Sequence, residues 1–272
     1  MVESTEEYPE VVVPLTVEQA IANLKHEDLS LRYYAAWWLG RFRVSEPAAI
    51  QALIVALEDE DYRTELGDYP LRRNAARALG KLGNRKAVPG LLKCLNCSDF
   101  YVREAAAQSL GMLGDPIAVP ALIPLLAGGV AAAVQVPGRP HLTQPYKAVL
   151  EALGSLKATD ALELIQPFLE HPVARVQYAA LRAMYQLTGD DVYGQRLMQG
   201  LESSDLNLRR VVLGDLGAIG YLPASNAIAR ASTESSFKIF ALKGLLEHQL
   251  NPTQLDLSDA AIQVMNLMDS LL

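Results

Sequence analysis

One nine-residue pattern constrains this chain more than any other feature of its sequence. It begins with a basic residue, carries a pair of small residues in the middle and ends in Leu-Gly. The pattern reads RYYAAWWLG at residues 32–40, RRNAARALG at 72–80 and REAAAQSLG at 103–111, and its frame returns at 209–217. Self-similarity of this kind indicates a repeat protein, in which copies of one small unit stack on each other.

Each unit is predicted to be a helical hairpin whose second helix contains the pattern. An acidic residue before that helix, such as Asp28, Asp68, Asp99 or Asp205, is expected to cap it and to share its oxygens with the arginine four residues later. The small pair lets neighbouring helices approach, and the final glycine is expected to end the helix in the left-handed conformation. Such a unit cannot bury its apolar face alone, so the sequence predicts an all-α solenoid of about six to seven repeats.

Two of the spacings between repeats are longer than the others. The terminal position of the pattern, or its equivalent, recurs at residues 40, 80, 111, 154, 184, 217 and 246. The additional residues form an acidic insertion at 58–70 and a second insertion, rich in proline and glycine, at 128–145. Insertions in a solenoid usually emerge on one face, often the face that binds a ligand or partner.

The repeat pattern stops near residue 250, which divides the chain into a solenoid (1–250) and a C-terminal extension (251–272). The extension contains one predicted helix, which begins at Ser258 and is apolar around much of its circumference. We expect this helix either to cap the open end of the solenoid or to dock on another subunit.

Composition excludes several functional classes. The chain has 24 Lys and Arg against 31 Asp and Glu, and no long basic run that would neutralise a nucleic-acid backbone. Its first residues are acidic and no apolar stretch has the length of a membrane span, which indicates a cytoplasmic protein. Cys94 and Cys97 have the spacing of a redox or metal pair, but no second pair completes a zinc site, so two helix cysteines without a metal are the simpler interpretation.

The second helices carry the candidate binding residues. Rows with a spacing of four remain outside the predicted packing seam on three successive second helices: Tyr33, Trp37 and Arg41, then Arg73, Arg77 and Lys81, then Glu104, Gln108 and Met112. Packed helices lie about 8–10 Å apart, so the first two rows are expected side by side on the inner surface. Aromatic rings and guanidinium groups together suit a flat conjugated ligand with carboxylates. In the alternative interpretation, the aromatic residues pack within a terminal repeat and the arginines face water.

His141 is the candidate for proton transfer. It lies in the second insertion, where repeat packing does not require it, and imidazole exchanges protons near neutral pH. A solvated loop histidine is the alternative. The sequence has no Gly-rich phosphate loop, no Gly-x-Ser-x-Gly elbow and no His-Glu-x-x-His motif, which removes the support for conventional hydrolase, kinase or dehydrogenase functions.

Three segments carry a resemblance to a known family. Residues 32–41 (RYYAAWWLGR), 71–81 (LRRNAARALGK) and 137–146 (PGRPHLTQPY) resemble the phycocyanobilin lyase subunits of the phycobilisome-lyase HEAT-like repeat family, and the similarity covers nearly the whole chain. The resemblance implies a HEAT-like solenoid that forms a heterodimer with a second, related HEAT-like subunit. The pair would attach phycocyanobilin, an open-chain tetrapyrrole, through a thioether to a cysteine of the phycocyanin alpha chain. Phycocyanobilin would be a substrate, and no cofactor would be permanently bound.

The resemblance also assigns roles to the candidate residues. Tyr33, Trp37, Arg41, Arg73 and Arg77 become candidates for bilin binding. Thioether formation needs a thiolate, which the acceptor protein supplies, and a protonated bilin with an electrophilic ethylidene carbon. Positioning is therefore expected to be the main contribution of the lyase.

His141 becomes the candidate proton relay. Asp61 or Glu65 in the acidic insertion is a hypothetical carboxylate partner for the pyrrole nitrogens, unless that loop is simply solvated. A non-enzymatic HEAT-like adaptor in phycobilisome assembly or degradation is the main alternative function, and a general interaction scaffold without a chromophore is a weaker one.

Overall fold

The computed structural model describes residues 15–250 and 257–272. Within them the chain forms sixteen α-helices and seven short 3-10 helices, and one isolated antiparallel bridge joins Gln135 to Leu142. The predicted all-α class is therefore confirmed. The acidic N-terminal residues and the Asn251-Pro252 dipeptide at the predicted domain boundary lie outside the described residues.

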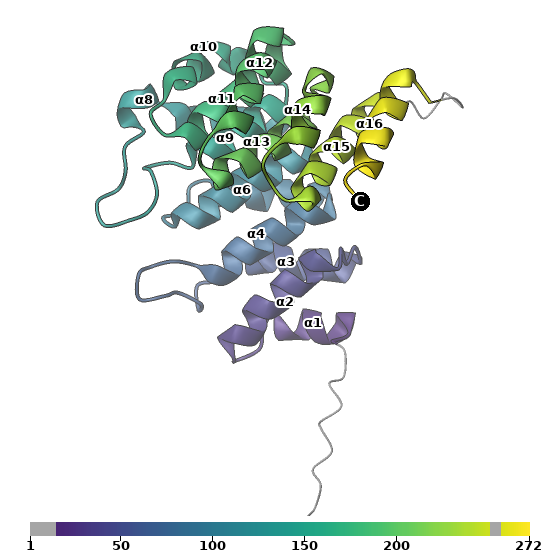
Figure 1. Cartoon of the computed structure of the whole chain (residues 1–272). Helices are drawn as coiled ribbons and strands as arrows, with labels where there is room; N and C mark the ends of the chain where they lie inside the picture. The colour runs from purple at the N-terminus through teal and green to yellow at the C-terminus, as the bar shows by residue number, and fades with distance from the viewer. Residues whose placement is uncertain (1–14, 251–256) are drawn as a thin grey trace, which may run out of the picture.

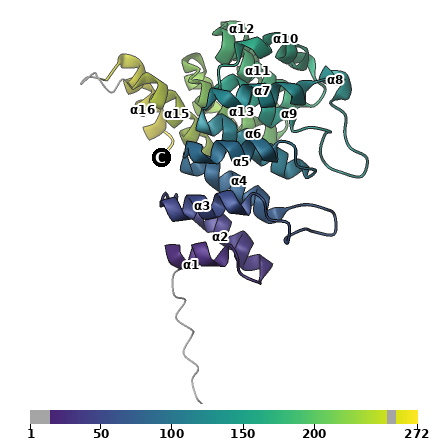
Figure 2. The same cartoon turned by 180° about the vertical axis from the view of Figure 1, so that it is seen from behind.

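The helices alternate between two layers and form seven hairpins, as the repeat pattern predicts (Figures 1 and 2). The second helices, which carry the pattern, are α2 (Leu29–Arg41), α4 (Pro70–Leu82), α6 (Phe100–Leu113), α9 (Tyr146–Ser155), α11 (Ala174–Thr188), α13 (Leu206–Ile219) and α15 (Ser235–Gln249). The first helices are α1 (Val17–Asn23), α3 (Pro47–Ala56), α5 (Val88–Cys94), α7 (Val119–Leu122), α10 (Leu162–Ile165), α12 (Asp191–Gln199) and α14 (Ser225–Arg230).

The two layers differ in how tightly they pack. Each second helix packs directly against the next along the whole described stack, whereas consecutive first helices scarcely touch. The stack consequently curves, and Figure 1 shows α15 set to one side of the column that α2, α4 and α6 form. The second helices are the closer layer, so they line the inner side of the curve.

Short side chains before the second helices cap them as expected. Asp28, Asp99 and Asp205 each accept a hydrogen bond from the backbone N–H two residues later, at 2.7–2.8 Å. Asp68 does not cap α4, which was predicted. Its backbone closes a turn with Thr64 instead, and Tyr69 is the residue at the helix start. The carboxylate of Asp68 is therefore directed to another partner, described below.

The predicted sharing of the capping carboxylate with the following arginine is wrong. The guanidinium of Arg103 donates instead to the carbonyl oxygens of Cys97 at 2.7 Å and Ser98 at 2.9 Å, and Arg209 bonds the Ser203 carbonyl in the same way. Helical side chains lean towards the N-terminus of their helix, which carries the long arginine past the cap to the preceding loop. These arginines fasten the turn within each hairpin.

The glycine of the Leu-Gly ending does not terminate the helix, contrary to the prediction. Gly80 lies inside α4, and a Cβ atom built on it would lie 2.9 Å from the Cα of Ser109 on α6. Gly40 approaches Ala78 of α4 in the same way, at 2.8 Å. The glycine thus allows close packing between second helices, and the left-handed position falls three residues later, at Gly83 and Gly114.

The C-terminal helix α16 (Asp259–Asp269) begins where predicted, because Ser258 accepts a hydrogen bond from the Ala261 N–H at 3.1 Å. It packs against α14 and α15 and buries Ala261 and Val264. This arrangement covers the last hairpin, while Ile262 stays exposed on the other side. Its docking on another subunit remains a prediction.

Candidate functional site

The aromatic row of α2 lies on the surface of the second-helix layer. Trp37 is 43% exposed, and its ring stacks on Tyr34 with centroids 5.5 Å apart. Tyr33 is half-buried, and its carbonyl accepts a hydrogen bond from Asn74 of α4 at 3.2 Å. Arg41 is exposed. Because α2 packs directly on α4, the aromatic and cationic rows belong to adjacent helices, as expected.

The cationic row of α4 finds its partners on α6. The guanidinium carbon of Arg73 lies 5.7 Å from the ring centroid of Tyr101, and Arg77 Nη2 lies 3.9 Å from Glu104 Oε2. The second distance is too long for a hydrogen bond, so Arg77 and Glu104 attract each other without a direct bond. The predicted cationic row is thereby continuous with residues of the third repeat.

The second insertion is an ordered hairpin that places His141 over the start of α6. The backbone N–H of Val136 donates to the His141 carbonyl at 3.0 Å. Arg103 of α6 then donates to the Thr143 carbonyl at 3.0 Å and to the Gln144 side chain at 3.1 Å. The loop is therefore anchored to a helix of the stack, which fixes the position of the imidazole.

The His141 ring forms part of an aromatic cluster. It stacks on Phe100 at a centroid distance of 4.1 Å with 7° between the planes, and it meets Tyr101 edge to face at 5.7 Å. His141 Nδ1 lies 2.9 Å from the Leu142 carbonyl, which can only accept, so Nδ1 carries a proton. In the neutral ring Nε2 is then the nitrogen that can accept a proton.

This cluster opens on a pocket of 440 Å³ between α6, α9, the second insertion and the start of α11. His141, Phe100 and Tyr101 line one side, and Lys147 and Arg175 bring positive charge to it. Glu104 lines the same pocket, and burial raises the pKa of its carboxyl above the usual range although Arg77 acts against this shift. The pocket therefore combines flat rings, cations and a partly desolvated carboxylate.

A second hollow of 270 Å³ continues along the same two helices. Its lining includes Gln108 and Glu151, which lie one helical turn beyond Glu104 on α6 and Lys147 on α9. Arg182 of α11 lies at its wall and pairs with Asp215 of α13 at 2.9 Å. Burial raises the pKa of Asp215 to about 6, with the nearby Glu151 adding to the effect. Together the two hollows form what we call the α6/α9 groove.

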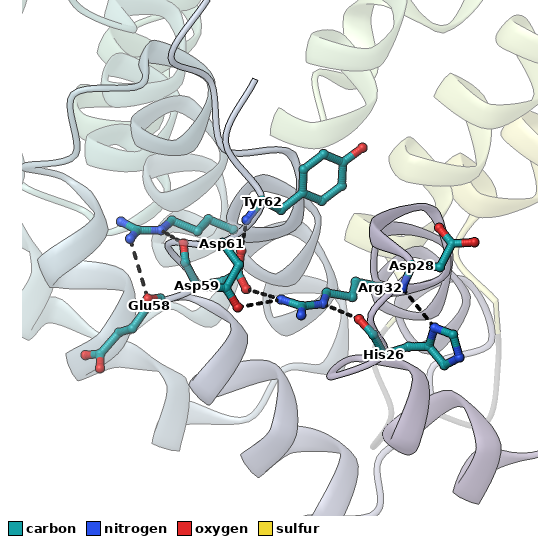
Figure 3. A network of polar contacts seen from close by, with 8 residues as sticks. His26, Asp28, Arg32, Glu58, Asp59, Asp61 and Tyr62 are labelled. Atoms are coloured by element: carbon teal, nitrogen blue, oxygen red, sulfur yellow. Dashed lines mark hydrogen bonds and ion pairs between the residues drawn. The ribbon is translucent and has the colours of Figure 1, made fainter. Parts of the chain in front are cut away.

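The acidic insertion holds Asp61 in an ion-pair network (Figure 3). Arg32 Nη1 contacts Asp59 at 2.9 Å and Asp61 at 3.1 Å, while its Nε donates to the His26 carbonyl at 2.5 Å. Asp59 also accepts a hydrogen bond from the Tyr62 backbone at 2.9 Å. The Asp61 side chain is 76% exposed, so the predicted carboxylate is paired and solvated at the same time.

Glu58 and Glu60 of this insertion are also paired, whereas Glu65, the alternative candidate, is exposed. Lys93 Nζ contacts Glu58 at 2.8 Å, and Arg72 bonds Glu60. These cations lower the pKa of both carboxyls below the usual range. Ion pairs thus hold the insertion to the neighbouring helices, which indicates a structural role for this loop.

The two insertions emerge on the same side of the stack, as expected (Figure 1). Arg139 of the second insertion donates to the Leu66 carbonyl at 2.7 Å and lies 3.6 Å from Asp68 of the first. The contact joins segments more than seventy residues apart in sequence. The insertions therefore form one continuous edge beside the α6/α9 groove.

Sequence reasoning missed the two aromatic residues at the start of α6. Phe100 and Tyr101 follow the cap Asp99, and Tyr101 takes the place that Ser30 and Pro70 occupy in the preceding repeats. An aromatic residue at a position that other repeats fill with small side chains was the available signal.

The buried member of the cysteine pair, Cys94, shows no sign of reactivity. Burial raises the pKa of the Cys94 thiol to about 12, so this thiol stays protonated at neutral pH, and both cysteines are free. Across residues 15–250 and 257–272, no three His, Cys, Asp or Glu side chains gather in a way that would hold a metal ion.

The stacked helical hairpins, with their second helices on the inner side, define a HEAT-like solenoid. Models of the HEAT repeats and of the PBS lyase HEAT-like repeat match residues 64–135 and 31–59, respectively. No helix in the described part of the chain is long and apolar enough to cross a bilayer.

Comparison with related proteins identifies the family within this class. The chain is 71% identical over 272 residues to the phycocyanobilin lyase subunit alpha of Nostoc sp. (strain PCC 7120), covering 99% of each sequence. It is 43% identical to the bilin biosynthesis protein PecE of the same organism, over 91% of this chain and 93% of that one. A chain in the solved complex of CpcE and CpcF of phycocyanin lyase from Nostoc sp. PCC7120 matches with a TM-score of 0.91 at 72% identity, over 99% and 100% of the two chains. The protein belongs to the family of phycocyanobilin lyase alpha subunits.

Proposed function

We propose that this chain is the alpha-type subunit of a heterodimeric bilin lyase, which binds phycocyanobilin and promotes its thioether attachment to a cysteine of the phycocyanin alpha chain. The observation that carries the proposal is the 71% identity over 99% of the chain to a phycocyanobilin lyase alpha subunit. The partner is a second HEAT-like lyase subunit, and the solved complex of CpcE and CpcF of phycocyanin lyase supports a lyase of two subunits. We place the reaction in the cytoplasm on the basis of composition.

The reaction is an addition in which no group leaves. The acceptor thiolate forms a sulfur–carbon bond to the exocyclic ethylidene carbon of the bilin, whose carbon–carbon double bond is consumed. A proton equivalent to that of the thiol ends on the adjacent ring carbon, and no electrons are exchanged with an oxidant or reductant. The lyase needs no nucleophile of its own, which agrees with the raised pKa of the Cys94 thiol.

The residues of the inner surface would bind the bilin and direct where the addition occurs. Cationic groups pair with propionates, and aromatic rings cover the conjugated plane. Holding both reactants in one geometry lowers the barrier by removing entropy that a free encounter would lose. His141, with Nε2 available as an acceptor, can pass a proton between thiol, solvent and bilin.

Reconstitution of the two subunits with phycocyanobilin and the apo phycocyanin alpha chain tests the proposal. We expect a covalent adduct to form at least ten times faster than by spontaneous addition, with one absorption maximum and with attachment at one cysteine. Formation of adduct at the spontaneous rate would overturn the proposal. Binding of the phycocyanin chain without any acceleration would indicate a non-enzymatic adaptor instead.

A further inference from the structure

We propose that the α6/α9 groove, closed at one end by the stacked rings of His141 and Phe100, is the site where the open-chain tetrapyrrole lies. This inference deepens the proposed function and rests on it. It places the ligand two repeats away from the aromatic row of α2 and assigns Glu104 as the residue that positions the ring nitrogens.

The shape of the groove fits an elongated ligand. The hollows of 440 and 270 Å³ follow one another along α6, from Phe100 to Met112. Twelve residues of helix rise about 18 Å, which is the scale of several linked five-membered rings. The α2 surface, by contrast, presents Trp37 stacked on its own neighbour Tyr34, and neither residue is among the lining of the two hollows.

The closed end of the groove offers a flat apolar wall. The His141 and Phe100 rings are nearly parallel in their stack, and Tyr101 meets the imidazole at 83°. A corner of this kind covers both the face and the edge of a planar ring. The anchoring of the second insertion by Arg103 fixes the corner before any ligand arrives.

The charges in the groove match the two kinds of polar group on such a ligand. Lys147 lines the pocket but pairs with Glu151 at 2.5 Å. Arg175 lines the pocket as well and Arg77 lies just beside it, so these two arginines offer carboxylates cationic partners on two sides. Glu104 is the one acidic residue of the pocket lining. Its carboxylate has no hydrogen-bond donor within the described part of the chain, although its side chain is only 26% exposed.

A ligand with N–H groups can therefore donate to the Glu104 carboxylate without displacing a donor of the described residues. The pyrrole N–H groups of a tetrapyrrole are donors, and a protonated ring system adds a positive charge that a desolvated carboxylate stabilises. Asp61 is less suited to this role, because Arg32 pairs with its Oδ2 at 3.1 Å and its side chain is 76% exposed to water. The assignment moves the predicted carboxylate from the acidic insertion to α6.

Glu104→Gln in the assembled heterodimer tests the positioning role. Phycocyanobilin is titrated by its visible absorption, and transfer to the apo phycocyanin alpha chain is measured separately. We expect about tenfold weaker bilin binding, a shifted absorption maximum of the bound bilin and slower transfer, with partial rescue by Glu104→Asp. Glu163→Gln, an exposed change on the outer helix α10, is the matched control and should leave all three unchanged.

Phe100→Leu and Trp37→Leu compare the two surfaces directly. If the bilin lies in the groove, Phe100→Leu should lose more bilin affinity than Trp37→Leu. Unfolding midpoints are measured in parallel so that a folding defect is recognised. Loss of binding in Trp37→Leu together with wild-type binding and spectrum in Glu104→Gln and Phe100→Leu would overturn the groove site and leave the lyase function standing. A wild-type heterodimer that neither binds bilin nor accelerates transfer would overturn the proposed function itself.

Discussion

The two insertions leave the same side of the solenoid but use their polar residues differently. In the acidic insertion several carboxylates are paired with cations of neighbouring helices, Asp59 and Asp61 with Arg32 of α2 and Glu60 with Arg72 of α4. In the second insertion Arg103 bonds the loop from outside, and the His141 ring is left to form a pocket wall. A loop held through ion pairs of its own side chains stabilises the fold, whereas a loop held at Thr143 and Gln144 can leave the side chain of His141 to a ligand.

Removal of the Arg103 side chain, which anchors the second insertion, should have the largest effect on stability and on bilin transfer. Arg103→Ala leaves four acceptors in two loops without their donor, and we expect a loss of about 3 kcal/mol in the free energy of unfolding. Bilin transfer should fall by more than tenfold, since the His141 corner loses its support. Urea unfolding and the transfer assay measure both. Wild-type transfer in this variant would show that the second insertion is positioned by other contacts.

A substitution in the acidic insertion should lower the stability of the protein but leave bilin transfer unchanged. Asp59→Ala breaks a largely buried ion pair and the bond to the Tyr62 backbone, which predicts a loss of about 2 kcal/mol. Under conditions where the variant is fully folded, its transfer rate per heterodimer should equal that of the wild type. A transfer defect in the folded variant would give this insertion a functional role and remove the distinction between the two loops.

Two substitutions of His141 separate stacking from proton transfer. His141→Phe keeps a flat ring beside Phe100 but has no nitrogen, while His141→Ala removes both. If Nε2 relays a proton, both variants should slow transfer several-fold, and bilin binding should weaken only in His141→Ala. Restored transfer in His141→Phe would reduce His141 to a wall of the pocket, and unchanged transfer in both would exclude it from the site.

The smallest effect is a difference in pH dependence between acids of the two regions. The bond from Arg72 lowers the pKa of Glu60 below 4.5, so its contribution to stability is present above pH 4.5 and is lost as the pH falls below it. Burial raises the pKa of Glu104 above 4.5, so its charge destabilises the fold at pH 7, and this cost disappears as the pH falls towards 4.5.

Replacing each glutamate by glutamine should therefore change the stability in opposite directions at pH 7. Glu60→Gln should lower the stability and Glu104→Gln should raise it, with the Glu104 difference vanishing first on acidification. Unfolding curves at pH 7, 5.5 and 4.5 check the signs, with Glu163→Gln as a flat reference. If both substitutions changed the free energy of unfolding in the same direction at pH 7, the proposed difference between the paired Glu60 and the partly buried Glu104 would be wrong.

The part of the site that sequence could predict was the part encoded along single helices. The spacing of four placed Tyr33 and Trp37 on one ridge, and a second helix beside it carried Arg73 and Arg77. It could not show that Arg73 faces Tyr101 of α6, because that depends on the register between helices. The candidate roles of these residues remain predictions until the variants are measured.

The Leu-Gly ending marks the same limit within the fold. A glycine near a helix end is most often a cap, and the chain alone offers no reason to prefer another role. Only the neighbouring helix shows that a Cβ at Gly40 would meet the Cα of Ala78 at 2.8 Å. The glycine is required by a contact between repeats and not by the backbone of its own helix.

The sequence by itself determined the all-α repeat architecture, three of the four predicted capping aspartates and the family, because these depend on spacing and on residues close together in the chain. The tertiary structure decided where the insertions meet, which arginines are already engaged and which carboxylate lacks a donor. Those features depend on side chains that come from different repeats, such as His141 and Phe100, and their contacts exist only once the helices are stacked.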